Sequence, residues 1–153
     1  MSKLAALFLI PLTLLSAAEL PSKKYLNQAA IKVMVAGAEA EAQKRNVHMT
    51  ICIVDESGNL LYFQKADGTG LNTIQFAQRK ARYAAMYRRP SQAAAEQLKN
   101  GDLQILAFPE AFPNRGGLPI KVDGETIGAI GASGATSDVD EAIAQAGIDA
   151  LLK

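Results

Sequence analysis

The dipeptide Asp123-Gly124 lies between two apolar runs, residues 118–122 and 126–132. Asp-Gly in this position is the strongest short-range signal of a two-residue β-hairpin. A second pair of apolar runs, residues 49–54 and 60–65, is separated by a polar turn that contains glycine. Because hairpin strands run antiparallel, these two hairpins predict an antiparallel sheet.

Helical periodicity surrounds the predicted hairpins. Apolar and small residues recur every three or four positions in four segments, which is typical of helices with one buried face. Asn72 or Thr73 can cap the second of these, and Pro90 must end it. The predicted helices cover residues 23–45, 72–89, 91–99 and 137–151.

A further apolar run, residues 103–108, is interpreted as a strand. The predicted order of elements is then α-β-β-α-α-β-β-β-α. This order predicts an α+β fold in which a five-stranded antiparallel sheet is flanked by helices. The chain has 153 residues, of which 49% are hydrophobic, which is enough for one buried core. We therefore expect a single domain over residues 19–153.

Residues 1–18 have the pattern of a secretory signal peptide. Lys3 is followed by the apolar run 4–15, and Ser16-Ala17-Ala18 places small residues where a signal peptidase cleaves. The apolar run is shorter than the roughly 20 residues that a membrane-spanning helix needs. We predict cleavage after Ala18, a periplasmic or secreted location, and no membrane attachment of the mature chain.

Residues 116–134 are rich in glycine but contain neither G-x-G-x-x-G nor a P-loop. Acidic residues in the first turn of the following helix would repel a phosphate. Gly128 and Gly131 lie inside a predicted strand, where glycine indicates a bulge or the close approach of another backbone or a ligand. The net charge of +1 offers no polybasic surface, so nucleic acid is not an expected partner.

Short motifs in a fixed order carry a resemblance that runs over residues 26–152. They are Val54-Asp55 with Gly58, Asp67-Gly68, residues 77–82 with Arg88-Arg89-Pro90, residues 116–120, and residues 127–134 with Asp140-Glu141. Together they resemble the GlcG/HbpS-like family of haem-degrading or haem-binding proteins. The resemblance implies a compact domain with a five-stranded antiparallel sheet and a homo-oligomer. Some members of the family are exported haem binders, and others are encoded with small-acid or diol metabolism, so the resemblance also implies a small-molecule ligand.

The residues and the resemblance together predict one ligand pocket. Its expected walls are the loop 67–69, one face of the helix 72–89, the proline-bounded loop 108–117 and the bare backbone of residues 131–134. The predicted ligand-binding residues are Asp67, Gly68, Thr69, Phe76, Lys80, Tyr83, Tyr87, Phe108, Phe112, Gly116, Gly117, Gly131, Ser133 and Gly134.

Haem needs an apolar slot, cations for its propionates and usually an axial ligand. The chain has no C-x-x-C-H motif, so any haem would be held non-covalently. Tyr83 stands where the family commonly has a small residue, and its phenol would either narrow the pocket or ligate the iron. Tyr83 is therefore the first axial candidate, and His48, the single histidine, is the second. No other metal site is expected, and Cys52 is predicted to be a buried thiol.

Two other functions stay open beside haem binding. The first is an enzyme that acts on a small hydroxy or keto acid by general acid–base chemistry, with Asp67 and Lys80 as candidate catalytic residues. The second is an oligomeric sensor or scaffold subunit that acts by protein contact. The sequence has no G-x-S-x-G motif and no paired histidines, so it does not decide whether the chain is an enzyme.

Overall fold

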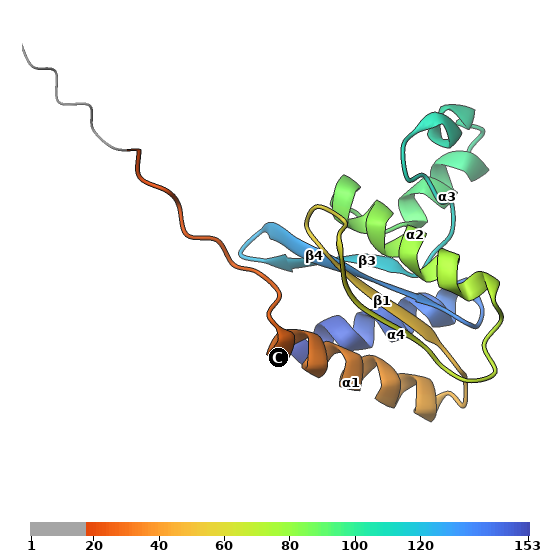
Figure 1. Ribbon diagram of the computed structural model, residues 1–153. Coiled ribbons are helices and arrows are strands. Elements are labelled where there is room, and N and C mark those ends of the chain that lie inside the picture. The colour runs from red at the N-terminus through yellow and green to blue at the C-terminus, as the bar shows by residue number, and fades with distance from the viewer. Residues whose placement is uncertain (1–17) are drawn as a thin grey trace, which may run out of the picture.

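The computed structural model describes residues 18–153. The predicted signal peptide thus lies outside the described residues, except for Ala18. The first described residues extend away from the body of the molecule (Figure 1). Lys23 and Lys24 then pair with Glu56 and Asp123, and Leu26 is the first buried residue of the described part. Within residues 18–153, no helix is both long enough and apolar enough to cross a membrane.

A single antiparallel sheet lies at the centre of the fold. Its strands are β1 (Thr50–Asp55), β2 (Leu60–Lys65), β3 (Gly117–Val122) and β4 (Glu125–Ser133), and their order is β2-β1-β4-β3. Both predicted hairpins are confirmed. Asp123 and Gly124 have φ angles of 52° and 82°, the left-handed conformations that a type I′ turn requires. The sheet is completed by the pairing of β1 with β4, which joins the two hairpins.

The prediction of a fifth strand over residues 103–108 was wrong, and so was the predicted order of elements. Leu103–Ala107 forms a short 3₁₀ helix, η1. The Asp102 carboxylate accepts the N–H of Gln104 at 3.1 Å and so caps this turn. Within η1 only Ile105 is buried, and it packs under the neighbouring helix α3 (Gln92–Lys99) rather than on the sheet. The described residues therefore hold four strands, not five.

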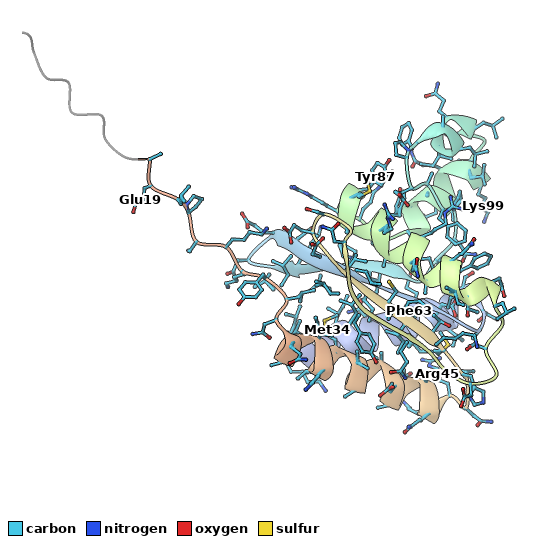
Figure 2. The ribbon with its side chains drawn as sticks, in the orientation of Figure 1. Glu19, Met34, Arg45, Phe63, Tyr87 and Lys99 are labelled. Carbon is cyan, nitrogen blue, oxygen red and sulfur yellow. The ribbon has the colours of Figure 1, made fainter. Side chains whose placement is uncertain are left out.

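Helices cover both faces of the sheet (Figure 1). On one face, α1 (Gln28–Lys44) and α4 (Ser137–Leu151) pack against each other, and Met34 points from α1 into the core (Figure 2). On the other face lies α2 (Asn72–Tyr87). The first helix begins later than predicted, because the Asn27 side chain accepts the N–H of Ala30 at 2.9 Å and caps α1 there.

Glycines in the sheet allow α2 to approach it closely. A Cβ atom on Gly131 would lie well under 3.0 Å from the carbonyl oxygen of Ala77, and one on Gly117 equally close to that of Lys80. The residues of α2 that face the sheet include Ala77 and Ala81, which are also small and fully buried. These two glycines therefore make room for the backbone of a helix.

Candidate functional site

A buried ion pair joins α2 to α4 at the end of the sheet. The Lys80 Nζ lies 2.7 Å from Oδ2 of Asp140 and also donates to the carbonyl oxygen of Ala132 at 3.1 Å. The two side chains are only 1% and 4% exposed. The other carboxylate oxygen, Oδ1, accepts the N–H groups of Gly134 and Ala135. Both charges thus have the hydrogen-bond partners that a buried ion pair requires.

Gly116 makes the space for this ion pair. Its φ angle of 109° lies in the region that favours glycine. A Cβ atom there would lie 2.8 Å from Cβ of Asp140 and 3.1 Å from Nζ of Lys80. Burial lowers the pKa of the Lys80 ammonium, and the hydrogen bond and charge of Asp140 oppose this shift.

The ion pair borders a cleft of about 240 Å³, which we call the Lys80 cleft. It lies between the first turns of α2 and α4 and the loop that precedes β3. The structure brings together four of the predicted ligand-binding residues at this cleft. They are Phe76, Lys80, Ser133 and Gly134. Phe112 lies beside them, because its ring centroid is 4.8 Å from that of Phe76.

The loop 67–69 does not join these residues. Asp67 and Gly68 are exposed, and the Thr69 hydroxyl donates to the backbone carbonyl of Ala66. Lys80 pairs with Asp140 rather than with Asp67, its expected catalytic partner.

Tyr83, Tyr87 and Phe108 form a separate aromatic cluster at the other end of α2. Tyr83 is fully buried, and its hydroxyl accepts a 2.9 Å hydrogen bond from Nε of Arg89. Tyr87 stacks between Tyr83 and Phe108 and donates to the carbonyl of Pro109 at 2.7 Å. Burial raises the pKa of the Tyr83 phenol. Tyr83 also packs against Ala94 of α3 and Ile105 of η1, so the cluster connects the end of α2 to the arm formed by α3 and η1, which projects from the body of the molecule (Figure 1).

His48 lines a different cavity, of about 440 Å³, which we call the His48 cavity. It lies between the C-terminal end of α1 and the first residues of β1. Ala42, Met49 and Ile51 contribute buried apolar surface to it, whereas the imidazole of His48 is exposed. The single histidine of the chain therefore borders an open, partly apolar cavity.

A chain of hydrogen bonds forms the polar wall of the His48 cavity. The Tyr62 hydroxyl donates to Oε1 of Gln64, and Nε2 of Gln64 donates to Oε1 of Glu39 at 2.7 Å. Lys65 stands beside the cavity, because its ammonium donates to the carbonyl of Ala66, a lining residue, at 3.3 Å. Burial, and secondarily the charge of Glu39, raise the pKa of Tyr62.

Gly134 separates the Lys80 cleft from the His48 cavity. It lines the cleft, while a Cβ atom on it would lie well under 3.0 Å from the carbonyl oxygen of His48 and 2.9 Å from Sδ of Met49. The two cavities are therefore in contact through one backbone segment.

Cys52 is a buried free thiol, as predicted. Burial raises its pKa to about 12. Among residues 18–153, no three or more His, Cys, Asp and Glu side chains are grouped so as to hold a metal ion.

The family model described as "Haem degrading protein HbpS-like" matches residues 26–149. The chain belongs to the HbpS-like family. Protein GlcG of Escherichia coli K12 is 34% identical over 112 residues, which cover 73% of this HbpS-like chain and 84% of GlcG. The predicted GlcG/HbpS-like resemblance is thus confirmed.

Two solved structures share the fold of this HbpS-like chain. The Klebsiella pneumoniae protein ORFY is 25% identical with a TM-score of 0.81, and the match covers 90% of this chain and 98% of ORFY. HbpS is 30% identical with a TM-score of 0.77, and the match covers 88% of this chain and 97% of HbpS.

Asp140 was not among the site residues predicted for this HbpS-like protein. The sequence placed it only in the motif Asp140-Glu141, near the start of the last helix. In the structure the N-cap residue of α4 is Thr136, and Asp140 instead binds Lys80 and two backbone N–H groups. The signal that could have found it is the lysine on a small-residue helix face, since a buried lysine needs a counter-charge.

Proposed function

We propose that this HbpS-like chain binds haem non-covalently in the His48 cavity, with His48 as the axial ligand. The observation that carries the proposal is that the single imidazole of the chain borders this partly apolar cavity. Its volume of about 440 Å³ lies within the range of roughly 300–1,000 Å³ typical of small-molecule sites. The family's description as haem-degrading supports haem as the ligand.

The residues of the His48 cavity fit the needs of haem. Imidazole is a common axial ligand of haem iron, and the surface of Ala42, Met49 and Ile51 suits an apolar ring face. The Glu39 carboxylate would repel the propionates, so they would face the rim, where Lys65 supplies a cation. Bound haem would supply a redox-active iron at this site.

Two features favour His48 over Tyr83 as the iron ligand. The Tyr83 phenol is fully buried and bonded to Arg89, so ligation by Tyr83 would require Arg89 to move. Tyr83 also lines neither the Lys80 cleft nor the His48 cavity. Ligation by Tyr83 stays a prediction, and one experiment tests both candidates.

The experiment is a hemin titration of residues 19–153, followed by visible absorption, with the wild type, His48→Ala and Tyr83→Phe. We expect a saturable Soret shift in the wild type and in Tyr83→Phe. In His48→Ala the Soret band should move and the affinity should fall, because the iron loses its imidazole ligand.

The other outcomes are equally informative. A Soret band that changes only in Tyr83→Phe would identify Tyr83 as the axial ligand instead of His48. A band unchanged in both variants would overturn both assignments. A featureless absorbance that rises linearly with hemin would mean non-specific adsorption and would overturn haem binding altogether.

We also propose that residues 1–18 direct export and that the mature chain begins at Glu19. The pattern of an apolar run followed by small residues supports this. Intact-mass measurement of the protein from the periplasm or the medium should give the mass of residues 19–153. The full-length mass in that fraction would contradict cleavage. Self-association, which the resemblance implies, stays a prediction that light scattering of the mature chain can check.

A further inference from the structure

We infer that the Lys80 cleft is a second binding site, which takes a small organic monocarboxylate. The start of α4 contributes free backbone donors to this cleft. The side chain of its N-cap residue, Thr136, makes no capping hydrogen bond. The first backbone hydrogen bond of the helix runs from the N–H of Asp140 to the carbonyl oxygen of Thr136, at 2.9 Å. The N–H groups of residues 137–139 precede that bond and have no partner within the helix. Ser137 lines the cleft, so this helix end borders it.

A buried serine whose hydroxyl has no partner in the described part of the chain lines the same cleft. Ser133 is 4% exposed and lines the cleft, and its hydroxyl makes no hydrogen bond to any residue in the described part of the chain. Ser133 pairs with Thr50 across the sheet, and the Thr50 hydroxyl meets that of Thr73 on α2 at 2.7 Å. The Ser133 side chain therefore lies on the α2 face of the sheet. The hydroxyl of this buried residue is therefore open to the cleft and free to bond a ligand there.

Two further side chains of the cleft, Lys80 and Asn114, have unused donors. Lys80 uses two of its three N–H groups, on Asp140 and Ala132. The side-chain oxygen Oδ1 of Asn114 accepts a hydrogen bond from the Ser137 hydroxyl. The side-chain N–H₂ group of Asn114 has no partner among residues 18–153. The Asp140 carboxylate already accepts three hydrogen bonds. The unused groups thus call for a ligand with acceptor oxygens, such as a carboxylate.

The charges around the cleft favour a single negative charge. Asp140 is neutralised by Lys80, and Arg115 pairs with both Asp138 and Glu141. The helix end then attracts an anion, while the neighbouring carboxylates limit its charge. The volume of about 240 Å³ suits an acid of few carbon atoms, and Phe76 supplies an apolar wall for its chain.

The test uses lactate as the probe and lactamide as its uncharged counterpart, with the haem-free mature chain. The amide resonances of Ser137, Asp138 and Val139 are followed by ¹H–¹⁵N NMR during titration. We expect saturable shifts of these resonances with lactate and none with lactamide. Ser133→Ala should weaken lactate binding by about tenfold, since a hydrogen bond to a charged group is lost. The exposed control variant Ser57→Ala should leave it unchanged.

Three results would overturn the inference. They are the absence of saturable shifts with lactate, equal shifts with lactamide or sulfate, and unchanged affinity in Ser133→Ala. The inference does not rest on haem binding, because the titration contains no haem. His48→Ala should bind lactate like the wild type, so a failure of either proposal can be told from a failure of the other.

Discussion

The Lys80 ammonium lies 2.7 Å from the Asp140 carboxylate, although α2 and α4 cover opposite faces of the sheet. The pair passes around the end of β3, where Gly116 leaves room for it. It is therefore a polar link between the two outer layers of the fold, and it also forms one side of the Lys80 cleft.

Lys80→Met should lower the free energy of unfolding by about 3–5 kcal/mol, because it leaves the Asp140 carboxylate buried without a counter-charge. Urea unfolding measures this loss. The control is Lys24→Met, which breaks the exposed pair with Asp123 and should cost about 0–1 kcal/mol. Equal losses in the two variants would show that the buried pair contributes no more than a surface pair.

Gly131→Ala should destabilise the protein by about 1–3 kcal/mol, the usual cost of overpacking. The added Cβ would meet the Ala77 carbonyl, which belongs to the backbone of α2 and cannot rotate away. Gly70→Ala is the matched control, since its Cβ would meet only the movable Asn72 side chain. Thermal unfolding of both variants checks this, and a stable Gly131→Ala would contradict the close packing of α2.

Cys52 should make stability depend on pH at high pH. Its thiol has a pKa of about 12 in the folded chain and an ordinary value of 9.0. Between these values the unfolded chain has lost this proton and the folded chain keeps it, so stability falls as pH rises. The slope attributable to the thiol approaches about 1.4 kcal/mol per pH unit.

The pH effect of Cys52 is isolated by comparison with Cys52→Ala. The stability difference between wild type and variant, measured by urea unfolding, should decline from pH 9 to pH 11. A difference that stays constant over this interval would mean that the thiol titrates normally. The native thiol should also resist labelling by a disulfide reagent at pH 8, because it is fully buried.

Tyr83→Phe should cost about 1–2 kcal/mol of stability, since Nε of Arg89 loses its acceptor. The loss should be accompanied by faster amide exchange in α3 and η1, because Arg89 also contacts Gln97 of α3 at 3.1 Å. Tyr25→Phe, at an exposed tyrosine, serves as the control. Unchanged exchange in the arm would contradict the role of the aromatic cluster in fixing it.

Local patterns were sufficient to predict most of the fold. Asp123-Gly124 predicted its hairpin correctly because turn chemistry acts over adjacent residues. The strand predicted for residues 103–108 was wrong because an apolar run of this length is compatible with either a strand or a helical turn. The cap formed by Asp102 favoured the turn.

The site was harder to predict than the fold. Helical periodicity predicted that Phe76 and Lys80 lie on one face of the same helix, and both line the Lys80 cleft in the structure. The ion pair itself joins residues 60 positions apart, so no local pattern signals it. The separation of Tyr83 from this cleft follows from the packing of the arm, which depends on contacts with Ala94 and Ile105.

Gly134 touches the Lys80 cleft on one side and the backbone of His48 on the other. An acid that displaced this glycine on binding would therefore alter the position of the imidazole, and with it the affinity for haem. Thermodynamic reciprocity requires that haem then change the affinity for the acid by the same factor. Titrations of lactate with and without haem, and of haem with and without lactate, would measure one coupling free energy by two independent routes.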